Sequence, residues 1–139
     1  MRPFWPSVAL VMLWVLAAAC GGAPASPAPA AQTGLVWHTL GTWSGRGSSQ
    51  TGSFDVTTGA LRVTWKTQPP GGVGAGRFRV ALHSAVSGRP LQIVVDTTGA
   101  GGETAYVQDE PRVSYLEIEA DALEWQVTVE EATSRPAGR

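Results

Sequence analysis

The sequence predicts one all-β domain, an antiparallel β-sandwich or jelly roll of about eight short strands. Apolar and polar residues alternate with a period of two from residue 35 onward, as in strands with one buried face. Glycine- and proline-rich breakers separate the alternating runs at short intervals. Beyond the first 20 residues, no segment of useful length has the apolar periodicity of an amphipathic helix.

The clearest strand is residues 60–67, where Leu61, Val63 and Trp65 share one face and polar residues occupy the other. The same alternation predicts strands at residues 77–84, 91–96, 113–120 and 123–131, and weaker signals predict strands at 35–43, 50–57 and 103–108. In the run 91–96, Leu91, Ile93 and Val95 are expected to point the same way. We expect Trp65, Phe78 and Trp125 to lie in the core, because each is in phase with aliphatic neighbours.

Charged residues fall on the outward faces of the predicted strands. Basic residues occur on early strands and acidic residues on late ones; they are Arg62, Lys66 and Arg79, and Glu117, Glu119, Glu124 and Glu130. If these strands are neighbours, cross-strand ion pairs form on a solvated face. The chain has a formal net charge of -1, which argues against a nucleic-acid partner.

The N-terminal residues have the pattern of an export signal. Arg2 precedes a largely apolar run, residues 7–19, that is shorter than the ~20 residues needed to cross a bilayer. Cys20, the sole cysteine, follows this run, and the segment LAAAC resembles the bacterial lipobox. The resemblance implies that residues 1–19 are removed and that Cys20 is acylated, although the usual leucine three residues before the cysteine is replaced by Ala17. The alternative is an ordinary secretory leader cut after Ala19.

The remaining chain divides into a linker, a domain and a tail. Residues 20–34 comprise the lipidated cysteine and a Pro/Ala-rich flexible linker with little to bury, which favours extended polyproline II. The β-sandwich is expected over residues 35–132 and a disordered tail over residues 133–139. A Gly/Ser-rich first strand, a strand with a central Trp65 and a closing pair over residues 115–131 resemble bacterial export-associated sandwiches of the pre-peptidase and CUB-like kind. This resemblance implies an accessory module without activity of its own.

No catalytic, metal-binding or cofactor-binding pattern stands out. The chain has no Gly-x-Ser-x-Gly elbow, and neither His38 nor His83 has a second metal-type ligand at a suitable spacing. We therefore predict no catalytic residues, no metal and no cofactor. Calcium bound by the carboxylates of segment 96–110 is the alternative for that region.

These observations together predict a membrane-anchored extracytoplasmic lipoprotein with a non-catalytic binding or interaction module. It would be held by its lipid on the cell membrane or outer membrane, facing the periplasm or the exterior, with a glycan or an envelope protein as partner. The candidate ligand-binding residues are Trp37, Trp43, Tyr106 and Tyr115, and the phase of the first two is ambiguous. The alternatives are a purely structural component of an envelope complex and, third, a small hydrolase. Solvent-facing tryptophans favour ligand stacking, and buried ones favour the structural role.

Overall fold

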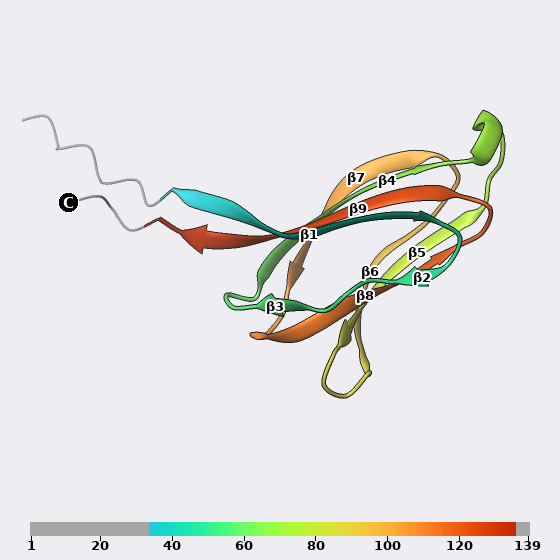
Figure 1. Cartoon of the computed structure of the whole chain (residues 1–139). Coiled ribbons are helices and arrows are strands. Elements are labelled where there is room, and N and C mark those ends of the chain that lie inside the picture. Colours follow the sequence, from blue (N-terminus) through green and yellow to red (C-terminus); the bar gives the residue numbers. More distant parts are fainter. Residues whose placement is uncertain (1–33, 136–139) are drawn as a thin grey trace, which may run out of the picture. The chain divides into compact units, whose positions relative to one another are not determined.

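The computed structural model describes residues 34–135, in which two antiparallel sheets pack face to face (Figure 1). The strands are β1 (Leu35–Arg46), β2 (Ser49–Gln50), β3 (Phe54–Val56), β4 (Ala60–Gln68), β5 (Arg77–Ser84), β6 (Pro90–Thr98), β7 (Gly101–Gln108), β8 (Arg112–Ala120) and β9 (Glu124–Ser134). A 3₁₀ turn, η1 (Pro70–Gly72), is the one helical element described. Within the described residues, no helix is long and apolar enough to span a membrane.

The strand order is that of a jelly roll. Sheet A has the order β1-β9-β4-β7, and sheet B has the order β2-β8-β5-β6, with β3 also paired to β8. Because β2 and β3 pair with the same strand, they act as two halves of one, and each sheet then has four positions. The chain passes between the sheets after β1, β3, β4, β6, β7 and β8, as expected for two interleaved Greek keys. The predicted all-β sandwich or jelly-roll class is confirmed.

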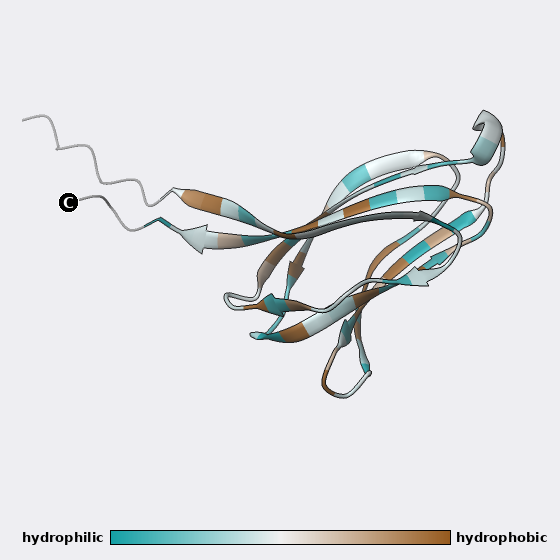
Figure 2. Cartoon of the chain, viewed as in Figure 1, coloured by the Kyte–Doolittle hydropathy of each residue, from teal (hydrophilic) through white to brown (hydrophobic). Residues whose placement is uncertain are grey.

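The space between the sheets is filled by the in-phase apolar residues of the central strands. Figure 2 shows the alternation of apolar and polar positions along the strands. Trp65, Phe78 and Trp125 are buried as predicted, and the rings of Trp65 and Phe78 lie 5.5 Å apart between their centroids. Aliphatic side chains complete the core: Leu61, Val63, Val80, Leu82, Leu116, Ile118, Val127 and Val129.

A β-bulge in β1 settles the phase of its two tryptophans. Thr39 pairs with Glu130 and Gly41 with Val129, so that Leu40 is the extra residue. Because of this extra residue, the odd-numbered positions of β1 face outward before the bulge and inward after it. Trp43 turns inward and packs against Phe54 at 5.7 Å between ring centroids, whereas Trp37 lies on the outer face of sheet A.

Two predictions about the strands need correction. Register shifts between β5 and β6 break the phase of the run 91–96, so Ile93 is 51% exposed while Val95 is buried. The predicted strand 50–57 is divided into β2 and β3, because the Thr51 hydroxyl accepts a hydrogen bond from the backbone N–H of Leu116 at 2.9 Å. At that point a side chain replaces a backbone acceptor of the ladder.

The last strand is longer than predicted. Thr133 and Ser134 pair with Val36 and Leu35, so β9 extends past residue 132 into what we expected to be the tail. The described ends of the chain consequently lie side by side (Figure 1). Residues 136–139 of the predicted tail, and the predicted leader, lipidated cysteine and linker up to residue 33, lie outside the described residues.

Glu131 is a buried carboxylate that fastens the connection from β3 to β4. It is 2% exposed and lies on the inward-facing positions of β9. Its oxygens accept hydrogen bonds from the Thr57 backbone N–H (2.7 Å), the Thr57 hydroxyl (2.8 Å) and the Thr58 hydroxyl (2.9 Å), and from the Thr58 backbone N–H. Burial by itself would raise the pKa of Glu131, but the hydrogen bonds from Thr58 and Thr57 outweigh it and hold the pKa below the ordinary 4.5.

We expect Glu131→Gln to lower the free energy of unfolding at pH 7 by about 1.5–3 kcal/mol, since the amide loses the charge and one acceptor oxygen. A carboxylate with a lowered native pKa stabilises the fold above its unfolded pKa and loses this contribution as the pH falls through the native value. The difference between wild type and variant should therefore shrink below pH 4.5. Urea unfolding at pH 7 and in acid measures both effects.

The matched control is Glu119→Gln on the exposed side of β8, which should change the unfolding free energy by less than about 0.5 kcal/mol. Equal stability of the two variants at pH 7 would show that Glu131 does not fasten the β3–β4 connection.

Candidate functional site

The outer face of sheet A is a continuous polar surface crossed by all four strands. From Thr39 to Arg46 of β1, the outward-facing residues align with those of the other strands in four rows, each defined by strand pairing. From one end to the other, the rows are Arg46, Glu124 and Gln68; Ser44, Gln126, Lys66 and Gly102; Thr42, Thr128, Thr64 and Thr104; and Thr39, Glu130, Arg62 and Tyr106. Trp37, which pairs with Ala132, lies beyond the fourth row. The four rows contain no aliphatic side chain larger than threonine, so this face does not resemble a surface buried by apolar packing.

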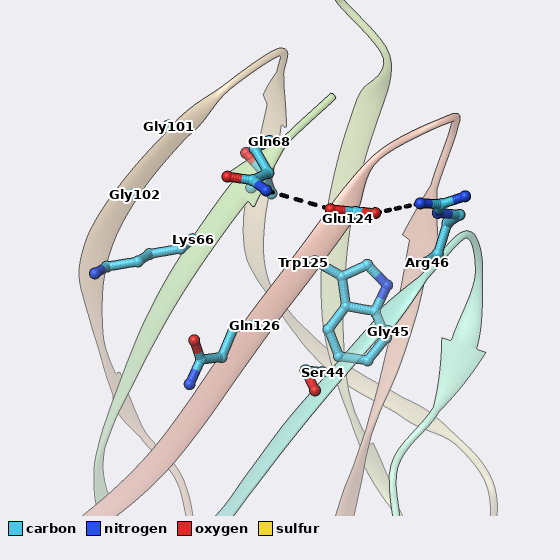
Figure 3. A pocket seen from close by; sticks show the side chains of 11 residues that line it. Ser44, Gly45, Arg46, Lys66, Gln68, Gly101, Gly102, Glu124, Trp125 and Gln126 are labelled. Carbon is cyan, nitrogen blue, oxygen red and sulfur yellow. Dashed lines mark hydrogen bonds and ion pairs between the residues drawn. The ribbon is translucent and has the colours of Figure 1, made fainter. Parts of the chain in front are cut away.

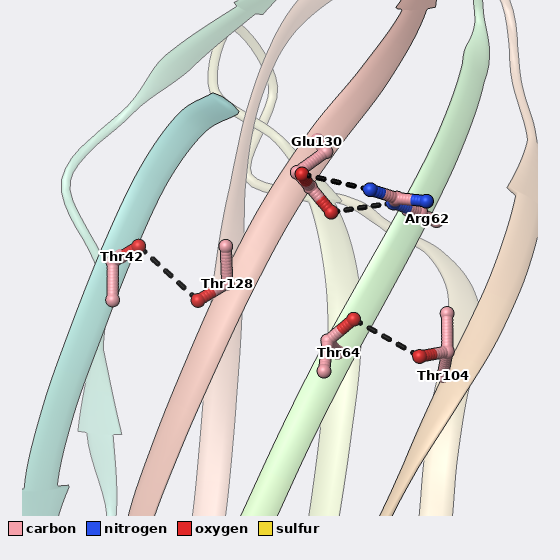
Figure 4. Close-up of polar contacts among 6 residues, drawn as sticks. All are labelled: Thr42, Arg62, Thr64, Thr104, Thr128 and Glu130. Carbon is pink, nitrogen blue, oxygen red and sulfur yellow. Dashed lines mark hydrogen bonds and ion pairs between the residues drawn. The ribbon is translucent and has the colours of Figure 1, made fainter. Parts of the chain in front are cut away.

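The third row consists of four threonines joined in pairs (Figure 4). The hydroxyls of Thr42 and Thr128 are 3.1 Å apart, and those of Thr64 and Thr104 are 3.0 Å apart. Each hydroxyl pair has two protons, and one of them is used within the pair. Every pair therefore keeps one donor and several lone pairs that can bind a polar ligand.

Arg62 and Glu130 form a two-point ion pair in the fourth row (Figure 4). Nη2 of Arg62 donates to Oε1 of Glu130 at 3.0 Å, and Nε donates to Oε2. The hydrogen bonds from Arg62 hold the pKa of Glu130 below its ordinary value. Such a bidentate pair fixes the plane of the guanidinium group, which makes it a firm support for a neighbouring ring.

Trp37 and Tyr106 meet above this ion pair. The Arg62 Cζ atom lies 4.4 Å from the centroid of the Trp37 ring, a cation–π contact. Tyr106, which pairs with Arg62 in the sheet, is 70% exposed, and its ring centroid is 6.1 Å from that of Trp37 with a 58° tilt. We call Trp37 and Tyr106 the aromatic pair. Its two rings come from β1 and β7, the two edge strands of sheet A.

A hollow lies at the other end of the same face, over the first two rows (Figure 3). Its volume is about 720 Å³, and the outward-facing polar side chains that line it are Ser44, Arg46, Lys66, Gln68, Glu124 and Gln126. Glu124 is already occupied: Arg46 donates to one of its oxygens, and Gln68 donates to the other at 3.2 Å. These hydrogen bonds, from Arg46 first, hold the pKa of Glu124 below its ordinary value.

Lys66 is the cation of the hollow that is available to a ligand. Within residues 34–135 it takes part in no ion pair. Its side chain extends from β4 toward β7 at Gly102, where the neighbouring strand has no side chain (Figure 3). A Cβ at Gly102 would lie 2.9 Å from the Trp65 carbonyl oxygen, closer than real Cβ contacts come, so that position needs glycine.

The other two predicted ligand-binding residues lie elsewhere. Trp43 packs against the core. Tyr115 is on the outer face of sheet B, where its ring stacks on His83 at 5.1 Å between centroids. His83 is 7% exposed, and its Nε2 lies 3.0 Å from a carboxylate oxygen of Glu117. The structure thus brings Trp37 and Tyr106 together and separates Trp43 and Tyr115 from them.

Three of the four carboxylates of segment 96–110, those of Asp96, Asp109 and Glu110, have arginine partners. Asp96 lies 2.9 Å from a guanidinium nitrogen of Arg77, and that hydrogen bond holds the pKa of Asp96 below its ordinary value. Arg112 contacts Glu110 at 2.9 Å and Asp109 at 3.3 Å. In the described part of the chain, no three residues of the His, Cys, Asp or Glu type are grouped as metal ligands.

The residues that line the hollow were not singled out as a site from the sequence, although alternation placed Lys66 and Glu124 outward. Comparison with protein-family models, with curated proteins and with solved structures gives no match to this chain. The candidate site, defined as the aromatic pair, the threonine row and the hollow, therefore stands on the geometry of sheet A alone.

Proposed function

We propose that this chain is an extracytoplasmic lipoprotein whose jelly-roll domain is a non-catalytic glycan-binding module. Its binding surface is the outer face of sheet A. The observation that carries the proposal is that the aromatic pair and the hollow share one face, with four threonine hydroxyls between them. A fold alone does not give function, so the proposal depends on this site.

The chemistry of the face matches a ligand that is rich in hydroxyl groups. A sugar ring presents C–H groups on its flat sides and hydroxyls around its rim. The exposed Tyr106 ring and the ring of Trp37 provide apolar area for the flat sides, and they lose little conformational entropy on binding. The threonine hydroxyls and the amides of Gln68 and Gln126 supply donors and acceptors for the rim.

The proposed anchor agrees with the position of the chain ends. Leu35 pairs with Ser134 at the end of the β1–β9 ribbon, so the described chain begins at the end of sheet A opposite to the hollow (Figure 1). A polyproline-II linker over residues 21–34 would place the domain roughly 30–40 Å from the lipid.

A structural role in an envelope complex is the second candidate. It is favoured by β1, an edge strand of 12 residues that pairs with β9 on one side only. Such an edge can accept a strand from another protein, with backbone hydrogen bonds giving the affinity.

Tyr106→Ala should weaken glycan binding about tenfold, and Trp37→Ala should do the same, because each removes one stacking surface. The measurement is titration calorimetry with the best ligand from a panel of soluble oligosaccharides. Tyr115→Ala is the matched control, since this tyrosine lies on sheet B and its loss should leave the affinity unchanged. Equal weakening by all three variants, or no binding by the wild type across the panel, would reject the module.

Cys20→Ser should move the protein from the membrane fraction to the soluble exported fraction and abolish labelling by a palmitate analogue. The physical reason is that two or three acyl chains are needed for stable anchoring and this cysteine provides the attachment point. Mass spectrometry of the wild-type N-terminus checks the cleavage site. An unmodified chain beginning at residue 20 would instead show an ordinary secretory leader.

A further inference from the structure

We infer that the ligand of sheet A is an acidic glycan, with one sugar ring on the aromatic pair and a carboxylate held by Lys66 in the hollow. The inference rests on the proposed glycan-binding function and adds the chemical class of the ligand. It follows from the charges of the face, the open space beside Lys66 and the spacing of the two contact points.

The charge balance of the four rows leaves one cation available. Arg46 is paired with Glu124, and Arg62 is paired with Glu130, which leaves Lys66 as the excess positive charge. Lys66 is also the sole lysine of the chain. A compact ammonium group with rotatable donors suits a single carboxylate, whereas a guanidinium group already held at two points does not.

The space beside Lys66 accommodates a carboxylate. Gly102, its partner in β7, cannot carry a side chain because its Cβ would lie 3.1 Å from the Lys66 Cγ and 2.9 Å from a backbone oxygen. Ser44 and Gln126 lie in the same row and offer neutral hydrogen-bonding groups. Apart from the Arg46–Glu124 ion pair, the hollow therefore presents one positive charge, with neutral polar groups in the same row.

The spacing of the two contact points requires an extended ligand. Lys66 is four residues from Arg62 along β4, and Tyr106 pairs with Arg62. At about 3.3 Å per residue, roughly 13 Å separates the two rows. A single sugar or a small free carboxylic acid cannot reach both contact points, whereas an oligosaccharide can, and the threonine row lies under its path.

An acidic peptide is the competing occupant, and the face favours the glycan. A peptide would gain specificity from apolar pockets for its side chains or from backbone pairing at a strand edge. The four rows instead lie on the face of the sheet and not along a strand edge, and their hydroxyls form no apolar pocket.

The test uses the full chain extracted in detergent, and it measures affinity for oligosaccharides of polygalacturonate, alginate and hyaluronate. Each probe is used with its carboxyl groups free and after methyl esterification. We expect the free acids to bind about tenfold more tightly than the esters at low salt, with the difference falling as salt is added. Lys66→Gln should remove the difference and leave the affinity for the esters unchanged. Arg79→Gln, on the outer side of sheet B, is the matched control and should keep the preference.

The outcomes separate the inference from the function on which it rests. Equal binding of acids and esters by wild type, still weakened by Tyr106→Ala, overturns the acidic ligand and keeps the glycan-binding module. A preference for acids that survives Lys66→Gln also overturns it. If poly-glutamate binds as tightly as the acidic oligosaccharides and Lys66→Gln weakens that binding, the glycan is rejected as the ligand and an acidic peptide takes its place. No binding of any acid or ester overturns both the inference and the proposed function.

Discussion

The arrangement of sheet A depends on the buried carboxylate of Glu131. This side chain holds the Thr57–Thr58 turn, through which the chain passes from sheet B into β4. Because Glu131 belongs to β9, the same contact fixes β4 against its neighbour in the sheet. Removing a buried acceptor from such a set leaves several donors without a partner, which is why one side chain has so large an influence. Arg62, which supports the Trp37 ring, and the proposed binding residue Lys66 both lie on β4, the strand that follows this turn.

The two faces of sheet A differ in composition and in what they contribute to the domain. The inner face supplies in-phase apolar residues to the core, with Trp65 and Trp125 buried among them. The outer face carries hydroxyls, amides and balanced ion pairs, and it contributes little to burial. Since the side chains of β4 and β9 alternate between the two faces, their outer residues can change without disturbing the core. In β1, the bulge at Leu40 places Trp43 against the core and Trp37 on the outer face.

Alternation and turn residues were enough to predict the fold class, most strand positions and the core tryptophans, because these are local consequences of burying one face. They were not enough for the site. Period two cannot reveal a bulge, so the phases of Trp37 and of the run 91–96 were out of reach. Nor can it reveal which strands are neighbours: Trp37 and Tyr106 come together only because β1 and β7 belong to one sheet. The sequence did show that Glu131 is unusual, because this glutamate is in phase with the inward-facing Val127 and Val129. Only the structure shows the hydrogen bonds that stabilise the carboxylate there.

The side-by-side chain ends have a mechanical consequence. If the domain is tethered through its N-terminus, tension in the tether acts on the free end of β1, at Leu35, beside the end of β9. The component of this tension that points away from β9 acts on the first hydrogen-bonded pairs of the β1–β9 ladder before it reaches the later ones. Trp37 is the third residue of β1 and is among the first to be pulled from the sheet. If the aromatic pair binds a glycan as proposed, a stretched tether would separate that pair before it unfolds the core, and the glycan would be held less tightly under load.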